Sequence, residues 1–158
     1  MAYWLMKSEP DVFGIDDLRK SPGKTDRWEG VRNYQVRNML RDEMQVGDLA
    51  FFYHSSCKEP GIVGVMKIVR AGYPDSTAFD PKAKYFDPKS DPRQPRWYMV
   101  DVRFVKKLKR VITLRELKTH VFLEDLPLLR RGNRLSVMPV SKAQWEYILA
   151  LEANVSPA

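Results

Sequence analysis

The sequence predicts an α+β domain with a curved, mostly antiparallel sheet and peripheral helices. Several segments have the two-residue alternation or the β-branched and aromatic content of strands, whereas others have the spacing or the capping residues of helices. The strands do not alternate regularly with helices, so a parallel sheet of βαβ units is not indicated. The 158 residues, of which 44% are hydrophobic, suit a single core.

The first half of the chain contains three expected strands and two expected helices. Val36, Met39 and Leu40 lie at positions i, i+3 and i+4 of a helix that Asn33 can cap. The short turn at residues 60–61 favours antiparallel pairing of the strands on either side of it. The strands are expected over residues 3–7, 49–54 and 62–69, the helices over residues 15–19 and from residue 33 onward, and a loop from residue 21 to Trp28.

The second half begins with a proline-rich stretch, residues 72–95, in which Asp-Pro-Lys occurs twice. This composition predicts a long ordered excursion rather than a linker between domains. Residues 97–105 alternate apolar and polar side chains and predict a strand, which a basic run at residues 106–110 follows. Capping-box pairs predict two helix starts, and a last strand is expected over residues 135–140. The pairs are Thr113 with Glu116 and Ser141 with Gln144, the second opening a helix that buries Trp145, Ile148 and Leu149.

Charge and cysteine content limit the partners and the compartment. The chain carries 27 basic and 20 acidic side chains, a net charge of +7, which favours polyanionic partners such as nucleic acids. A single cysteine excludes an internal disulfide and indicates a reducing compartment. Apolar runs are far shorter than the roughly 20 residues that cross a bilayer, and the N-terminus does not resemble a signal peptide. We therefore expect a soluble, cytoplasmic protein without a membrane partner.

Catalytic and cofactor motifs are not found in the sequence. Only two histidines are present, and nothing in the pattern places either beside a nucleophile and a third orienting group. His54 and Cys57 have the spacing of metal ligands, but no further ligands follow at matching spacing. Neither a phosphate-binding loop nor a dinucleotide fingerprint occurs. We expect no catalytic residues, no metal site and no cofactor.

Four segments mix aromatic or small residues with polar groups at strand ends and helix starts. They are KSEP at residues 7–10, WEGVRN at 28–33, FYHS at 52–55 and RLSVMP at 134–139. With the YFDPKSDPRQPRW stretch and VDV at 100–102, the chain resembles the EVE domain family, and within it the thymocyte nuclear protein 1 type, from about residue 3 to residue 151. The domain is expected over residues 1–152, with a short tail at 153–158.

The resemblance implies a PUA-like pseudo-barrel whose pocket suits a modified nucleobase, with no established catalytic activity. Trp28 is the expected floor on which a base stacks, and Gly30 beside it permits close approach of the backbone. The resemblance and the basic residues of its motifs give the expected ligand-binding set. The set is Lys7, Ser8, Trp28, Val31, Arg32, Asn33, His54, Ser55, Arg134, Ser136, Met138 and Pro139.

Three hypotheses for the function follow from these observations. The first is a non-catalytic module that holds one modified base of DNA or RNA, while basic residues, including those at 106–110 and 130–134, contact phosphates. The second is a nucleic-acid processing enzyme, such as a base glycosylase with Glu9 or His54 as acid or base. The third is a module for a small molecule or a protein. Each residue of the set also has a structural explanation, such as core packing for Trp28 and helix capping for Asn33.

Overall fold

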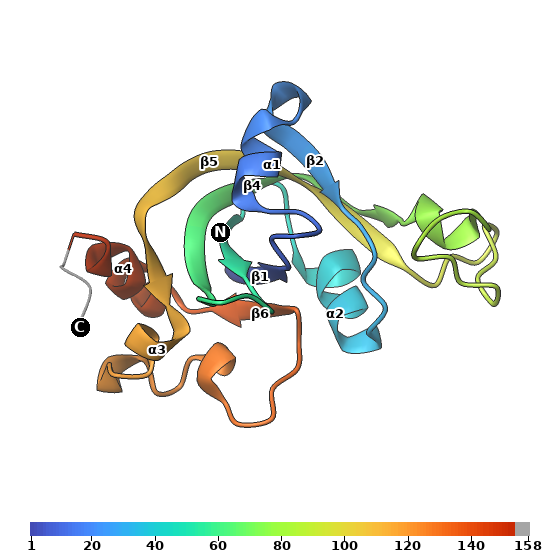
Figure 1. Cartoon of the computed structure of the whole chain (residues 1–158). Coiled ribbons are helices and arrows are strands. Elements are labelled where there is room, and N and C mark those ends of the chain that lie inside the picture. Colours follow the sequence, from blue (N-terminus) through green and yellow to red (C-terminus); the bar gives the residue numbers. More distant parts are fainter. Residues whose placement is uncertain (154–158) are drawn as a thin grey trace.

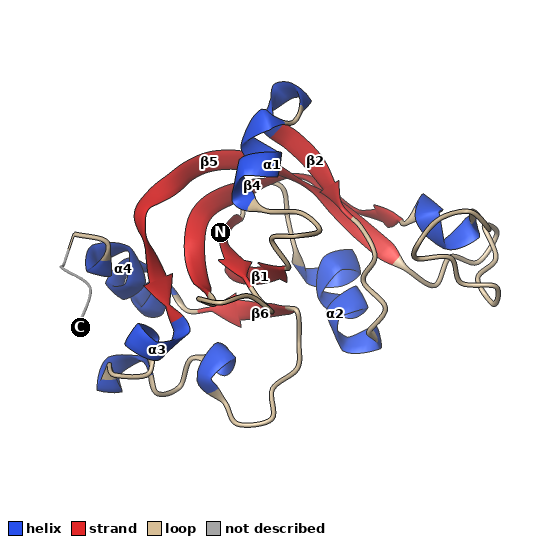
Figure 2. Ribbon diagram, in the orientation of Figure 1, coloured by secondary structure: helices blue, strands red, loops and turns tan. Residues whose placement is uncertain are grey.

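Two long strands form the curved centre of a six-stranded sheet (Figures 1 and 2). They are β4 (Gly61–Pro74) and β5 (Tyr98–Thr113), which pair antiparallel with several register shifts between them. Such bulges increase bending and twist, which accounts for the curvature. The chain is described here from a computed structural model covering residues 1–153, so residues 154–158 of the expected tail lie outside the described residues.

The strand order in the sheet is β2-β5-β4-β3-β1-β6. Among the strands of residues 1–153, only the β1–β3 pair is parallel, and the other four pairs are antiparallel, as predicted for a mostly antiparallel sheet. The remaining strands are β1 (Tyr3–Ser8), β2 (Thr25–Trp28), β3 (Leu49–His54) and β6 (Val137–Val140). The helices are α1 (Ile15–Lys20), η1 (Pro22–Lys24), α2 (Tyr34–Asn38), η2 (Met39–Glu43), η3 (Ser76–Phe79), α3 (Leu114–Leu117), η4 (Val121–Leu123), η5 (Pro127–Leu129) and α4 (Lys142–Leu151).

The sheet has a hydrophobic core on each face. Along β3, Ala50 and Phe52 belong to one core, whereas Phe51 and Tyr53 belong to the other, because successive side chains of a strand point to opposite faces. Helices α1, α2 and η2 complete the first, which we call the cleft-side core. Helices α3, η4, η5 and α4 complete the second, the far-side core. This double burial explains the continuous apolar run of β3.

Three segments differ from the sequence-based expectation. Residues 25–28, expected to be a loop, form strand β2, whose backbone groups pair with β5 although its side chains are mostly polar. Strand β5 continues through the basic run to Thr113, because pairing with β4 satisfies its backbone. The three lysines of the run are exposed, whereas Arg110 is mostly buried against Glu116. Strand β6 begins two residues later than expected, at Val137.

Both predicted helix starts are present, but one of the two lacks the reciprocal side-chain bond of a capping box. Ser141 and Gln144 form the full reciprocal capping box at the start of α4. At α3, Thr113 accepts from the Glu116 amide, but the Glu116 side chain pairs with Arg110 instead of returning to the cap. In α4 Leu149 is only partly buried, and Leu151 is buried below it. Among residues 1–153, none of the helices has both the length and the apolar character needed to cross a bilayer.

Candidate functional site

The segment between β4 and β5, residues 75–97, projects from the sheet and is called the excursion below (Figure 1). A cleft of about 720 Å³ is lined by this excursion and by the ends of β1 and β2. Six of the twelve expected ligand-binding residues line it: Lys7, Ser8, Trp28, Val31, Arg32 and Ser136. Its other lining residues come from the turn after β1, from β2 and the loop that follows it, and from the excursion. They are Glu9, Val12, Phe13, Asp26, Arg27, Glu29, Gly30, Thr77, Asp80, Ala83, Lys84 and Tyr85.

Three aromatic residues line this cleft, namely Phe13, Trp28 and Tyr85, and the last two come from distant segments. Trp28, the last residue of β2, is 7% exposed and packs edge-on against Phe52 of the cleft-side core, with ring centroids 5.4 Å apart. Tyr85 of the excursion lies against Gly30, whose φ is +84°. A Cβ on Gly30 would come within 2.6 Å of the Tyr85 ring, so only glycine allows this approach. The cleft thus has a tryptophan floor and a tyrosine wall.

Arg32 joins the cleft loop to the excursion. Its Nε and Nη2 donate to the Tyr85 carbonyl at 3.1 and 2.5 Å, and its Nη1 donates to the Val31 carbonyl and to Asp75. Nη2 also donates to Thr77 at 3.3 Å. A guanidinium has five N–H groups, and these five contacts use all of them. Arg32 therefore lines the cleft but holds Tyr85 in place, with no donor left for a phosphate or a base.

Asp75 is the buried acceptor at the centre of this network. Its carboxylate is fully buried and accepts from the Gly30 amide at 2.9 Å, from Arg32 at 3.1 Å and from the amide and hydroxyl of Thr77. Burial alone would raise the pKa of Asp75, but the hydrogen bonds from Thr77, Gly30 and Arg32 outweigh it and lower the pKa below the usual 3.8. The carboxylate is thus ionised at neutral pH and fixes the wall of the cleft.

The rim of the cleft carries charges of both signs. Arg27 pairs with Glu29 at 2.8 Å, whereas the ammonium of Lys7 has no carboxylate partner among residues 1–153 and lies 5.9 Å from the Tyr53 ring centroid. Partial burial lowers the pKa of Lys7. Lys84 also lines the cleft, with its ammonium 5.4 Å from the Tyr85 ring centroid. Because the Lys7 ammonium lies beside Tyr53 of the far-side core, Lys84 is the lining cation better placed for an anionic ligand.

Three of the expected residues have structural roles beside the cleft rather than in its lining. The Asn33 side chain accepts from the Val36 amide and caps α2. The His54 Nε2 accepts from the Ile15 amide at 3.1 Å and so completes the start of α1, while burial lowers the pKa of His54 and favours the neutral ring. The Ser55 amide donates to the Ser8 carbonyl. Their contact with a ligand stays a prediction.

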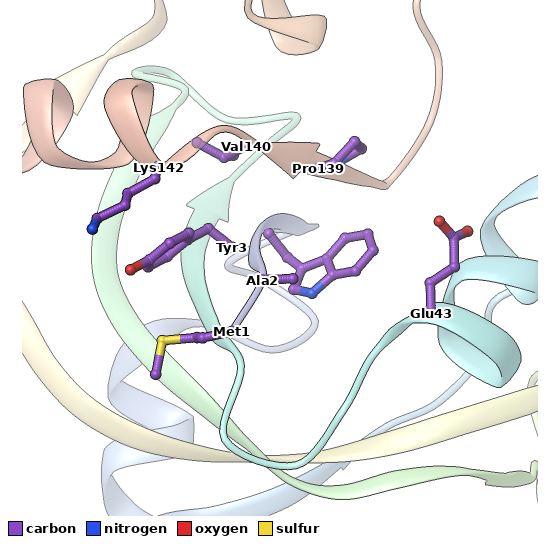
Figure 3. A pocket seen from close by; sticks show the side chains of 8 residues that line it. Met1, Ala2, Tyr3, Glu43, Pro139, Val140 and Lys142 are labelled. Atoms are coloured by element: carbon purple, nitrogen blue, oxygen red, sulfur yellow. The ribbon is translucent and has the colours of Figure 1, made fainter.

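The other three expected residues come from the RLSVMP segment. Arg134 is exposed before β6, and Met138 is fully buried in the far-side core. Pro139 lines a second hollow of about 570 Å³ together with Tyr3 and Glu43 (Figure 3). Since side chains alternate along a strand, Met138 and Pro139 cannot both face the cleft that Ser136 lines.

The basic run proposed for phosphate contact lies on β5. Lys106 pairs with Glu152 at 3.4 Å, Lys107 with Asp16 at 3.1 Å and Arg110 with Glu116 at 2.6 Å. The run is therefore largely neutralised by neighbouring carboxylates. Within residues 1–153, no three side chains of His, Cys, Asp or Glu gather in a manner that would hold a metal ion.

Sequence reasoning missed two features of this site. Tyr85 belongs to the YFDPKSDPRQPRW stretch, but nothing in its spacing shows that it returns to the loop at Gly30. Asp75 precedes Ser76 and Thr77 as a helix-capping residue does, a signal that predicts its bond to the Thr77 amide. Its contacts with Gly30 and Arg32, 45 and 43 residues away, depend on the tertiary fold.

The curved, mostly antiparallel sheet, the peripheral helices and the cleft define a domain of the α+β class with a PUA-like fold. A distant likeness supports this fold alone: the YTH domain of the Zygosaccharomyces rouxii MRB1 protein, at 13% identity, superposes with a TM-score of 0.55 over 99% of this chain and 87% of that chain. The family model for the EVE domain matches residues 2–151. The chain belongs to the EVE domain family.

Several relatives that match nearly the whole chain are called thymocyte nuclear protein 1. Thymocyte nuclear protein 1 of Danio rerio is 49% identical over 94% of this chain and 71% of its own length, and that of Homo sapiens is 45% identical over 96% and 74%. A Pseudomonas syringae protein of known structure is 55% identical, with a TM-score of 0.91, covering 96% of this chain and 99% of that chain. The human THYN1 protein in complex with DNA containing 5-methylcytosine is 44% identical, with a TM-score of 0.90, covering 99% and 100%.

Proposed function

We propose that the cleft holds one modified nucleobase of a nucleic-acid strand, with 5-methylcytosine in DNA as the first ligand to test. The observation that carries this proposal is the cleft itself, in which Trp28 forms the floor, Tyr85 forms a wall and Lys84 lies beside Tyr85. Flat aromatic surfaces suit a base, and Lys84 suits a neighbouring phosphate.

The DNA complex of the human relative supports the proposed ligand. That protein, 44% identical over 99% of this chain, was crystallised with DNA containing 5-methylcytosine. The net charge of +7 favours the same class of partner. We propose that the module binds the base without changing it, because the Arg32 guanidinium and the Asp75 carboxylate are used in hydrogen bonds that hold the cleft together.

Energetics favour a base that is already exposed. Extruding a base from a duplex costs a few kcal/mol, about what one stacking contact and one or two hydrogen bonds return. Burying one methyl group contributes about 0.8 kcal/mol, which is roughly a fourfold preference. A stronger preference for the methylated base therefore requires a cleft whose shape excludes the alternatives.

The first test follows tryptophan fluorescence of the protein during titration with single-stranded DNA and RNA. Each oligonucleotide carries one cytosine or one 5-methylcytosine. We expect quenching that depends on the modification and that is reduced in Trp28→Phe, while Trp145→Phe, in the far-side core, retains it. Equal binding of every oligonucleotide, governed by salt alone, would contradict the base-binding proposal and leave a general basic surface.

A second candidate function is enzymatic removal of the base, which the position of Glu9 favours. Glu9 lines the cleft, as a general acid or base would have to. His54 is a poorer candidate because its Nε2 accepts from the Ile15 amide and the residue does not line the cleft. Release of free base from a modified oligonucleotide, abolished in Glu9→Gln, would favour the enzyme over the binding module.

The location of the protein in the cell is also a proposal. Composition favours the cytoplasm, whereas the eukaryotic relatives are called nuclear proteins. A fluorescent fusion imaged in the source cells distinguishes the two.

A further inference from the structure

A continuous stack of aromatic rings and guanidinium groups runs from the cleft to the surface of α2. Arg32, which lines the cleft, has its Cζ 5.8 Å from the Tyr85 ring centroid and 5.5 Å from that of Trp97. Trp97 stacks on Tyr34 with centroids 4.8 Å apart and planes inclined by 24°. Arg37 follows, with its Cζ 4.9 Å from the Tyr34 ring centroid. The outer end of the stack is the pair Tyr34 and Arg37.

Tyr34 of this outer pair is exposed, whereas Arg37 is half-buried and is held by hydrogen bonds. Tyr34 is 52% exposed, an unusual state for a large aromatic residue, whereas Trp97 beneath it is buried and donates from Nε1 to Asp87 at 2.6 Å. The Arg37 guanidinium donates to the Arg96 carbonyl at 2.7 Å and to the Asn38 side chain at 2.9 Å. Holding both groups in place before binding reduces the entropy lost when a ligand stacks on them.

Arg37 is the cation of this surface that has no ion-pair partner among residues 1–153. Arg41 of η2 and Arg96 at the end of the excursion are paired with Asp42 at 2.8 Å and with Asp87 at 3.7 Å. Aromatic rings and arginine planes on a basic surface are the groups on which unpaired bases stack.

We propose that Tyr34 and Arg37 form a platform for an unpaired base that neighbours, in the same strand, the base held in the cleft. The proposal rests on the proposed function, because the same strand must occupy both places. Continuity of the stack from the cleft argues for one strand across both sites: Tyr85 and Arg32 line the cleft, and Trp97 links them to Tyr34. The platform proposal therefore predicts a ligand of at least two nucleotides rather than a free nucleotide.

The test compares three ligands by calorimetric titration: 5-methyl-dCMP, a trinucleotide with central 5-methylcytosine, and the same trinucleotide with abasic flanking positions. Tyr34→Ala should weaken binding of the full trinucleotide roughly 5- to 150-fold, which is the usual value of one stacked base, and leave the other two ligands unchanged. Tyr34→Phe, which keeps the ring, should bind as the wild type does. Tyr34→Leu, which keeps bulk without a ring, should resemble alanine.

Phe122→Ala is the matched control, because Phe122 is exposed to a similar extent, 55%, but stacks on Tyr147 on the far side. It should leave all three affinities unchanged. Equal affinity of the wild type and Tyr34→Ala for the full trinucleotide overturns the platform, while the cleft proposal stands if Trp28→Phe still weakens 5-methyl-dCMP. Unchanged affinity of Trp28→Phe for 5-methyl-dCMP and for the full trinucleotide, with the Tyr34 effect retained, overturns the cleft proposal alone. If none of the ligands binds, both proposals fail.

Discussion

Each of the two cores is bordered by one arginine paired with a buried carboxylate, and the two pairs are built differently. Arg110 binds Glu116 through two hydrogen bonds, at 2.6 and 2.8 Å, and also donates to the Leu151 carbonyl. Arg32 makes one contact with Asp75 and distributes its other donors over three further acceptors. The first pair joins residues six positions apart, and the second joins residues 43 positions apart.

The different distribution of hydrogen bonds indicates a different role for each arginine–carboxylate pair. Arg110 binds both Glu116 of α3 and the carbonyl of Leu151 at the end of α4. It therefore fixes the end of α4 against α3 and stabilises the far-side core. A distributed arginine fixes the relative position of several loops at once, here the backbone at Tyr85 and the loop at Gly30. Buried pairs of the same chemistry thus serve packing in one region and the shape of a binding site in the other.

Removing the two carboxylates is the strongest test of this comparison. Asp75→Ala and Glu116→Ala each leave a partly buried guanidinium without its carboxylate, so each should lower the free energy of unfolding by about 3–5 kcal/mol. Urea denaturation measures this loss. Only Asp75→Ala should also weaken base binding, because only Asp75 holds the cleft.

Binding must be measured where both variants are folded, which circular dichroism establishes. A domain of this size has about 5–15 kcal/mol of stability, so both variants should fold at low temperature. Equal loss of base binding in Glu116→Ala would show that binding reports general stability and would remove the distinction between the two pairs.

A glycine substitution sharpens the comparison with an intermediate effect. Gly30→Ala strains a backbone with φ of +84° and pushes a Cβ against Tyr85, so we expect about 1–3 kcal/mol of destabilisation and at least tenfold weaker base binding. Gly132→Ala is the control, since its φ is +78° and a Cβ there meets nothing within 4 Å. It should lose about 1 kcal/mol by thermal melting and bind normally. Similar binding by both variants would contradict the role of Tyr85 as a wall.

The smallest expected effect concerns pH. Burial lowers the pKa of His54 below 6.5, so the unfolded chain binds more protons than the folded one near that pH. Stability should therefore fall as pH decreases from about 6.5 towards the pKa of the folded state, and stay flat above it. His54→Gln keeps an acceptor for the Ile15 amide but does not titrate. Its melting temperature should change less between pH 7 and pH 5, and parallel curves for both proteins would refute the assignment.

Periodicity and capping residues were enough to predict most of the fold. The runs at residues 3–7 and 49–54 became strands because both faces of the sheet are covered, and Asn33 and Ser141 cap helices as predicted. The strand at residues 25–28 was not predicted because Thr25, Asp26 and Arg27 have no apolar alternation, and their pairing is supplied by β5, more than 70 residues away.

The cleft was predicted less completely than the fold. Short motifs located Lys7, Ser8 and Trp28, since these lie at strand ends that meet in space. A motif does not specify which of its members face inward, and Met138 and Pro139 show the consequence. Arg32 was predicted to bind the ligand, but its five donors are used within the protein, which only tertiary contacts reveal.

The place of β1 in the sheet has a consequence for how the chain folds. This strand lies between β3 and β6, so the first strand in the sequence is completed only by the last. During synthesis, β1 must wait for residues 137–140 to leave the ribosome before its second edge is paired. Non-local pairing of this kind slows folding, and an unpaired edge is prone to aggregate. We expect chains that end before β6 to require chaperone protection, although their cleft residues up to Tyr85 are already made.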